Sequence, residues 1–326
     1  MTKRTFLAFA GVAVLVTALP IPAATVAKKG TVGILEVEYE MTSQGSRKRE
    51  NDQAEWHGKR ILTIAFEVVA GEVQARPVTL VGVPKGKNSF AARMDTKAKE
   101  NAASQKSLDA AVKACKQDAA CKTRVTLEYM GSDAGAKAIA DTSAFGSEAA
   151  GKGGPPRYQF WSPVGVKGKP RVVSGTYVVD QYVKTESYDP LCGKTKNICT
   201  EIRVIKGSGP LTAEALQFFD WTLGMEGMLS GGIILDTQDS TLTVGIPHPN
   251  ALIEIVETVD ETAGGKHATK KKEPWLAQAQ KWDDGLGVAD LACPDPLREL
   301  RGEITKKVFN GYAPTMTIRW HFAVKP

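Results

Sequence analysis

The first 27 residues constrain this chain more than any other feature, because they have the pattern of an export signal. Lys3 and Arg4 precede an uncharged apolar stretch from Phe6 to Leu19, and prolines then lead to the small residues of Thr25-Val26-Ala27. This basic, apolar and small-residue order predicts a secretory signal peptide that is cleaved after Ala27. Export would bring the rest of the chain into an oxidising compartment, where cysteines form disulfides.

An uncleaved membrane anchor is the alternative for this segment. A spanning helix needs about 20 apolar residues, whereas the run from Phe6 to Leu19 is shorter and is followed by Pro20 and Pro22. No later stretch is long enough and free enough of charge to span a bilayer. We therefore expect a mature protein that is soluble and is periplasmic or secreted.

The composition predicts a globular protein with a real core, since 42% of the residues are hydrophobic and 24% are charged. The predicted signal contains two of the 42 basic residues and none of the 36 acidic ones, so the mature formal charge is +4. A dedicated nucleic-acid-binding protein normally has a larger and clustered basic excess. We expect no nucleic-acid partner and no cofactor.

Five cysteines follow the predicted signal, and their spacing indicates two local disulfides with Cys293 left over. Cys192 and Cys199 flank a turn-rich insert between two strand-like runs, where a disulfide would close the neck of a hairpin. A zinc site would need more ligands at close spacing. Cys293 is either a buried thiol or the partner of a cysteine in another chain.

Cys115 and Cys121 make a structural prediction of their own. The Ala- and Lys-rich stretch before Cys115 has helical periodicity. Six residues along a continuous helix would place the two α-carbons about 9 Å apart, beyond the roughly 7 Å limit for a disulfide. A Cys115–Cys121 disulfide therefore requires the helix to break between them, around Gln117-Asp118.

Strict alternation marks the first and last strands of the mature chain. One face of the first strand is apolar and the other is acidic, a pattern typical of a half-buried strand. Its apolar residues are Leu35, Val37, Tyr39 and Met41, and its acidic residues are Glu36, Glu38 and Glu40. Near the C-terminus the apolar face holds Met316, Ile318, Trp320 and Phe322, opposite Thr317, Arg319 and His321.

We expect an N-terminal domain over residues 28–130, a Gly/Ala/Ser-rich linker or long loop over 131–157, and a C-terminal β-rich domain over 158–326. The N-terminal domain is predicted to contain strands at 33–41, 61–69 and 74–83, a polar insert at 43–59, and a helix over 95–120. Residues 125–129 alternate like a strand, and a second helix remains the alternative.

The C-terminal domain is predicted to be built from hairpins with a few helices. Strands are expected at 176–183, 200–205, 233–236, 241–246, 252–259, 303–309 and 315–322. Helices are expected from Thr212, Pro274 and Asp295-Pro296, and a basic loop is expected at 266–272. The fold class is therefore α+β and β-dominated, an antiparallel meander of hairpins with a few packing helices in two lobes.

The search for chemistry identifies no catalytic residue, no metal ligand and no binding residue. The four histidines, His57, His248, His267 and His321, form no metal-binding or catalytic motif. The turn from Asp236 to Ser240 offers alternating oxygens that could suit calcium, but it lacks the glycine and the distal glutamate of an EF-hand, and a polar turn explains it as well. Asp283-Asp284 fits the polar end of a helix.

Two basic clusters and three tryptophans offer surfaces for recognition. The clusters are Lys266 with Lys270 to Lys272, and Arg47-Lys48-Arg49. They could contact anionic lipid head groups or an acidic partner, although such runs usually keep loops solvated. Trp56, Trp161 and Trp320 could be surface aromatics, with Trp320 better explained as a core residue.

These observations favour an exported, non-enzymatic protein that binds a partner or helps to assemble an envelope structure. Its partner would be an unidentified protein or an anionic envelope component. The first alternative is a carrier of a lipid or another apolar ligand in a β-lined cavity. The second is an envelope hydrolase whose site assembles only in three dimensions.

Overall fold

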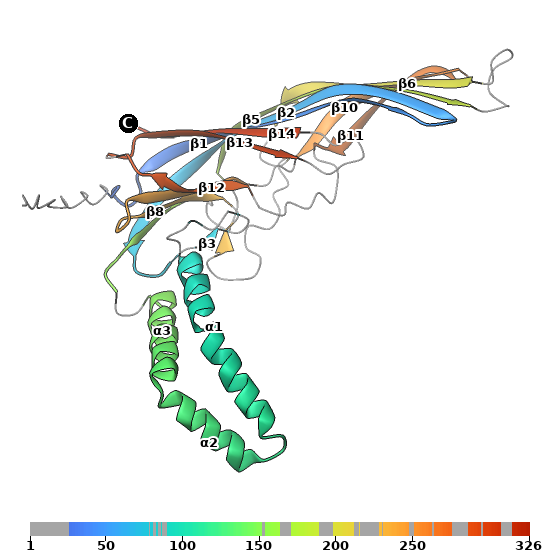
Figure 1. Ribbon diagram of the computed structural model, residues 1–326. Coiled ribbons are helices and arrows are strands. Elements are labelled where there is room, and N and C mark those ends of the chain that lie inside the picture. Colours follow the sequence, from blue (N-terminus) through green and yellow to red (C-terminus); the bar gives the residue numbers. More distant parts are fainter. Residues whose placement is uncertain are drawn as a thin grey trace, which may run out of the picture.

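The structure is a computed structural model with a β-dominated α+β fold, as expected from the sequence (Figure 1). Its described part holds one 12-stranded antiparallel sheet, a separate two-stranded pair and three helices. The described residues are 26–77, 79–80, 83, 86, 90–151, 154–163, 171–188, 198–211, 215, 228–229, 231–247, 251–262, 264–275, 286–294, 296–307 and 315–326.

Along the chain, three strands precede the three described helices, and the remaining strands follow them. The strands are β1 (Val32–Lys48), β2 (Asp52–Gln74), β3 (Thr79–Leu80), β4 (Tyr158–Ser162), β5 (Val172–Tyr188), β6 (Ile198–Pro210), β7 (Met228–Leu229), β8 (Gly232–Asp236), β9 (Thr241–Gly245), β10 (Leu252–Glu261), β11 (Gly265–Pro274), β12 (Gly287–Ala292), β13 (Glu299–Lys307) and β14 (Thr315–Val324). The helices α1 (Phe90–Ala114), α2 (Ala119–Met130) and α3 (Asp133–Ala149) lie between β3 and β4.

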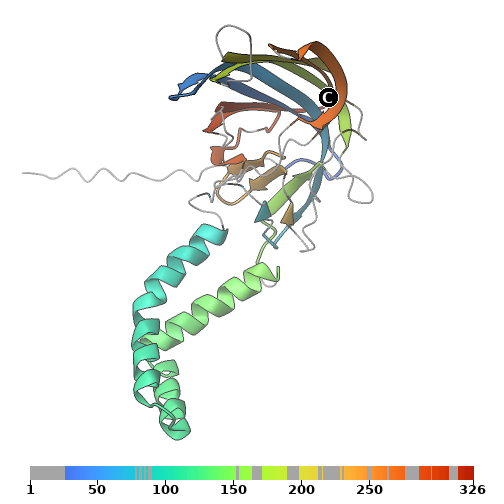
Figure 2. The same cartoon turned by 90° about the vertical axis from the view of Figure 1, so that its right-hand side faces the viewer.

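Strand β2 is the centre of the sheet. It is 23 residues long, and its residues 53–69 pair with β1 along one edge, with β14 and β13 following beyond β1. Along the other edge, residues 52–66 pair with β5 and residues 69–74 pair with β4. From there the sheet continues as β5-β6-β10-β11 and as β4-β8-β9-β12. The long strands curve together in the turned view (Figure 2).

The alternating patterns of the first and last strands correctly identified the inner face of this sheet. Leu35, Tyr39 and Phe322 are fully buried, and Trp320 is a core residue with 3% exposure. The glutamates of β1 lie on the outer face, where Arg319 pairs with Glu38 at 2.7 Å. Burial of one face and solvation of the other is the arrangement that period-2 patterning predicts in an antiparallel sheet.

The polar insert expected at 43–59 is instead a continuation of the first hairpin, because β1 extends to Lys48 and β2 begins at Asp52. The pairing of β2 with β5 satisfies its backbone groups there, although the apolar alternation has ended. The turn is closed by the backbone N–H of Arg49, which donates to the carbonyl of Asp52 at 2.7 Å.

Two helices replace the strand and the long loop that were expected over 125–157. Helix α2 begins where the Asp118 side chain accepts from the backbone N–H of Cys121 at 3.0 Å. Val125 and Tyr129 of α2 are four residues apart on one helical face and are half-buried, whereas Leu127 is exposed. The apolar spacing that resembled a strand is therefore part of a helix. Helix α3 forms because its alanines favour helix and Ser132 caps its N-terminus.

The basic segment at 266–272 is not a loop but most of β11, an edge strand of the sheet. Glutamates of β10 pair with its lysines across the two strands: Lys271 lies 2.6 Å from Glu257, and Lys270 and Lys272 each lie 3.3 Å from Glu254. Lysines on an edge strand disfavour pairing with the edges of other molecules.

Two further expectations about helices differ from the structure. Pro274, where a helix was expected to begin, is instead the last residue of β11. Trp275 after it is fully buried, and its indole Nε1 donates to the carbonyl of Ile61 at 3.2 Å. The short helix expected after Asp295-Pro296 is replaced by β13, so that Gly302 lies within a strand rather than ending a helix. Pairing with β14 supplies the hydrogen bonds that decide this.

Strands from both expected domains pair in the same sheet, since β1 and β2 join β14 and β5. The boundary expected at 131–157 therefore does not divide the sheet. Several expectations lie outside the described residues: Cys192, His248, the helix from Thr212 and most of the helix from Pro274, including Asp283-Asp284.

Tryptophans on β2 and β14 each cover a glycine on the neighbouring strand. Gly45 lies directly across from Trp56, and Gly302 lies directly across from Trp320. A Cβ added at Gly302 would overlap the indole ring of Trp320. The missing side chain is therefore what lets the ring lie flat on the partner strand.

Substitution Gly302→Val should consequently lower the free energy of unfolding by about 1–3 kcal/mol, because Trp320 would have to leave its place in the packed core. Denaturant unfolding measures this change. Thr305→Val, on the exposed side of the same strand, is the control and should be nearly neutral. Equal stability of the two variants would contradict the packing described.

Candidate interaction site on the helical arm

Residues 90–151 form an extension that we call the arm. Helix α1 leaves the sheet, α2 turns back at the far end and α3 returns to β4 (Figures 1 and 2). In both views the arm projects away from the strands. Its sequence position, between β3 and β4, means that both of its ends are held by the β body.

Polar contacts link the helices of the arm. The Asn101 amide donates to Asp141 at 3.3 Å, and Lys137 pairs with Glu100 at 3.4 Å. Helix α2 has no buried residue. Helices in proteins normally owe most of their stability to an apolar face that packs on a core, so α2 lacks the usual source of helix stability.

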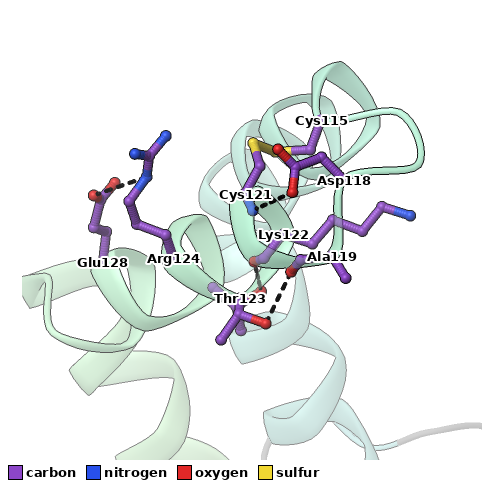
Figure 3. The surroundings of a disulfide bond; sticks show 9 residues. Cys115, Asp118, Ala119, Cys121, Lys122, Thr123, Arg124 and Glu128 are labelled. Carbon is purple, nitrogen blue, oxygen red and sulfur yellow. Dashed lines mark hydrogen bonds and ion pairs between the residues drawn. A yellow bond between two sulfur atoms is a disulfide. The ribbon is translucent and has the colours of Figure 1, made fainter.

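A disulfide fixes the far end of the arm. Helix α1 ends at Ala114, and the Cys115–Cys121 disulfide spans the turn into α2, with the two α-carbons 5.6 Å apart (Figure 3). Lys116 in this turn has a φ of 52°, the left-handed backbone conformation that tight helix-ending turns require. The helix thus breaks between the two cysteines, as the length of a disulfide demands.

The other described cysteines lie in the β body. Cys199 is disulfide-bonded, in strand β6. Cys293 is a half-buried thiol that packs against the core, and its sulfur lies 3.4 Å from the carbonyl oxygen of Pro294.

An open hollow of about 530 Å³ lies beside the disulfide at the tip of the arm. It is lined by Asp109, Val112, Lys113, Lys116, Gln117 and Lys122. Three cations and one anion make this hollow basic. Its chemistry suits an acidic partner, since charges of opposite sign steer association and fix its register.

Large apolar side chains are exposed along the arm. Leu127 is 63% exposed on α2, and Met130, three residues later, lies on the same helical face with 49% exposure. Met94 on α1 and Ile139 on α3 are exposed to a similar degree. Single exposed apolar residues are common, but here they lie on helices that have little core of their own.

An ion pair within the base of the arm is hydrogen-bonded to the sheet. Arg93 of α1 donates to both carboxylate oxygens of Glu148 in α3, at 3.1 and 2.5 Å, and the hydroxyl of Tyr158 in β4 donates to the same carboxylate at 2.9 Å. Burial alone would raise the pKa of Glu148, but these hydrogen bonds outweigh it and hold that pKa below its usual value. Burial raises the pKa of Tyr158.

The neighbouring Arg157 gathers the acidic residues of the β8–β9 turn. Its guanidinium binds both carboxylate oxygens of Asp236, at 2.8 and 2.7 Å, and one oxygen of Asp239 at 2.7 Å. Arginine therefore binds the two carboxylates that the sequence offered to calcium in this turn, which favours the polar-turn interpretation. A cavity of about 280 Å³ lies between this cluster and α3, with Glu148 and Gln238 in its lining.

The described histidines are scattered over the surface. His57 lies in β2 rather than in a loop and stacks on Tyr182 with ring centroids 4.8 Å apart. The Nε2 of His321 lies 2.9 Å from a carboxylate oxygen of Glu299, and both side chains are at least 38% exposed. His267 is exposed on β11. This is a set of surface contacts rather than a cleft in which a catalytic pair could exclude water.

The tryptophans and the first basic cluster are also placed by the structure. Trp161 is fully buried and Trp320 is nearly so, and both belong to the core. Trp56 is half-buried against Gly45. Arg47 pairs with Asp52 at 3.1 Å at the end of the first hairpin.

Within the described residues, no group of three or more His, Cys, Asp or Glu side chains is placed to hold a metal ion. None of the described helices has both the length and the apolar character needed to cross a bilayer.

Comparisons with known proteins give no relationship from which a function could be transferred. No family model matches the chain, and no curated protein matches it. Among solved structures, the crystal structure of the transport unit of the autotransporter AIDA-I from Escherichia coli has 6% sequence identity to this chain. The match covers 97% of this chain and 93% of that chain, but its TM-score is 0.14, so it supports no conclusion about fold or function.

Sequence reasoning predicted the first helix of the arm and its break before Cys121, but it missed α3 and the cluster at the base of the arm. The members of this cluster, such as Arg93 and Glu148, are 55 residues apart and carry no motif. The sequence does contain a sign of one buried polar contact in the β body. Gln159 lies between Tyr158 and Phe160 in a short apolar run, which is typical of a buried amide with a specific partner.

Replacing both Cys115 and Cys121 by serine should loosen the tip of the arm and leave the sheet intact. The chain-entropy model gives a loop of this length about 2 kcal/mol of stabilisation. Hydrogen exchange should therefore become faster in α2 and at the end of α1, with unchanged protection in β1 and β2. Unchanged exchange in α2 would contradict the role assigned to the disulfide.

Glu148→Gln should weaken the base of the arm and lower the free energy of unfolding by about 1–2 kcal/mol, because Arg93 loses its charged partner in a half-buried position. Glu128→Gln is the control, since its pair with Arg124 is about 70% exposed and 3.9 Å apart, and it should be nearly neutral. Thermal unfolding of both variants gives the comparison.

The same contact predicts a pH dependence. The folded pKa of Glu148 lies below its usual value, so its contribution to stability is present above the pKa of the unfolded chain and is lost as the pH falls through the folded pKa. The stability difference between the native protein and Glu148→Gln should therefore shrink on acidification below about pH 4. A difference that grows in acid would contradict this linkage.

Proposed function

We propose that this chain is an exported, non-enzymatic binding or envelope-assembly protein that engages a partner protein through its helical arm. The sheet serves as a rigid body, and the arm presents its outer surface to the partner. In this proposal an N-terminal export signal within residues 1–27 directs the protein to the periplasm or outside the cell. The partner is a protein whose contact surface is apolar with an acidic rim.

The observation that carries this proposal is the exposed apolar surface of α2. Leu127 is 63% exposed and Met130 is 49% exposed on one face of a helix that has no buried residue. A bound partner would cover these side chains and supply the packing that the polar contacts of the arm do not. Grooves that bind helices commonly use apolar anchors spaced three and four residues apart.

The charge of the arm supports a protein partner with acidic groups. On β11 the lysines are already paired with Glu254 and Glu257, so that cluster has little positive charge to offer. At the tip of the arm, Lys113, Lys116 and Lys122 surround an open hollow beside a single aspartate. The tip is thus a better position for a charged contact than either basic cluster expected from the sequence.

The alternative of an apolar-ligand carrier draws less support. Large aromatic side chains pack against each other on the inner face of the sheet: Trp161 and Phe322 meet edge to face at 5.2 Å, and Tyr39 and Trp275 do so at 6.3 Å. These rings occupy space that a ligand would need. The hydrolase alternative draws no support from the described histidines, which lie on the surface.

A photoreactive amino acid in place of Leu127, introduced in cells that export the protein, tests the proposal. Because the side chain is exposed and contacts no core, the variant should fold, and illumination should yield one defined protein adduct identified by mass spectrometry. The same residue at Ser107, an exposed position of α1, is the control and should give at least tenfold less of that adduct.

The charge variant Leu127→Asp should abolish the adduct formed from a probe at Met130, whereas Ser107→Asp should leave it unchanged. Both variants add one negative charge, so they separate loss of the apolar contact from a general charge effect. If probes at Leu127, Met130 and Ile139 all gave no more adduct than the probe at Ser107, the arm would be ruled out as the binding surface.

A further inference from the structure

Gln159 is a buried amide that binds the backbone of the residue at which the sequence predicts signal cleavage. Its Nε2 donates to the carbonyl of Ala27 at 2.7 Å, and its Oε1 accepts from the backbone N–H of Ala27 at 3.1 Å. One side-chain amide thus satisfies both polar groups of one residue, across a separation of 132 residues in the sequence. Such a reciprocal pair imitates the hydrogen bonding of a neighbouring strand.

The burial of Gln159 makes this contact costly to lose. The side chain is 1% exposed in β4, and its second N–H donates to the carbonyl of Gly71 at 3.0 Å, where β2 has a register shift. Removing Ala27 would leave an amide oxygen and one amide N–H without these partners in a buried position. An unsatisfied buried polar group destabilises a protein by more than the hydrogen bond itself contributes.

The chain around Ala27 is fitted to the body on both sides of the amide contact. Ala27 is half-buried and packs against the main hydrophobic core. Three residues later, the backbone N–H of Gly30 donates to the carbonyl of Ala70 at 2.8 Å, and Ala70 in turn donates to Thr31 at 2.9 Å. The segment from Ala27 to Thr31 is therefore held along β2 as part of the fold.

We propose that proteolytic processing leaves Ala27 in the mature protein, so that the export signal is removed upstream of this residue and not after it. Ala23 and Ala24 are the small residues that lie upstream of Ala27 and after the apolar stretch. Gln159 then acts as the binding site for the mature N-terminal segment. This inference rests on the proposed export, because only an exported chain is processed.

The N-terminus of protein purified from the export compartment decides where processing occurs. Intact-mass measurement and N-terminal sequencing should give a start at Ala27 or at one of the few residues before it. A start at Lys28 or later would overturn the inference while leaving export in place. A start at Met1 in reduced, cytosolic protein would instead refute the proposed export, and the inference about processing would fall with it.

A thermodynamic cycle tests the Gln159 contact by itself. Two versions of the oxidised protein are compared, one that starts at Val26 and one that starts at Lys28. The shorter version should melt about 3–6 °C lower, because a buried amide loses two hydrogen bonds. Substitution Gln159→Leu should lower the melting temperature of the longer version and have a much smaller effect, or the opposite effect, in the shorter one.

Gln74→Leu is the matched control, because Gln74 is an exposed amide at the end of β2, and it should affect both versions equally. Equal melting temperatures of the two unsubstituted versions, or an equal effect of Gln159→Leu in both, would show that the body does not depend on Ala27. Either result would overturn the inference even if the sequenced N-terminus lay upstream.

Discussion

Backbone hydrogen bonding along β2 is the constraint on which the rest of the structure depends. One edge of this strand pairs with β1, and the other edge pairs with β5 and then with β4. Strands from the two ends of the chain therefore meet in one sheet, and a division into separate N- and C-terminal units is not possible without breaking these ladders. The register of β2 also decides which side chains form the core, because a shift by one residue would turn every side chain to the opposite face.

The body and the arm are stabilised by different interactions. In the body, aromatic and aliphatic side chains of many strands form one buried cluster. In the arm, α2 has no buried residue, and the helices are linked by polar contacts, a disulfide at the tip and the Arg93–Glu148 pair at the base. This contrast is the reason for placing a partner on the arm, because its apolar residues, Leu127 above all, are left exposed by the described part of the chain.

Sequence reasoning succeeded where a local pattern reported a local physical requirement. Alternation in β1 and β14 identified the buried face, and the length of a disulfide correctly required the helix to end between Cys115 and Cys121. It failed where pairing partners supplied what the pattern lacked. The lysines of β11 resembled a solvated loop because the glutamates that neutralise them lie on another strand. The site at the base of the arm was not visible either, since its members come from α1, α3 and β4.

The sequence by itself determined the strand character of its alternating segments, the buried faces of β1 and β14, and the break between α1 and α2, because these follow from side-chain periodicity and bond lengths within a few residues. Only the tertiary structure decided which polar groups meet. Gln159 and Ala27, or Arg157 and Asp236, are joined by the register and curvature of strands that are far apart in the sequence. The free energy of such contacts depends on burial, and burial is a property of the assembled fold rather than of any segment.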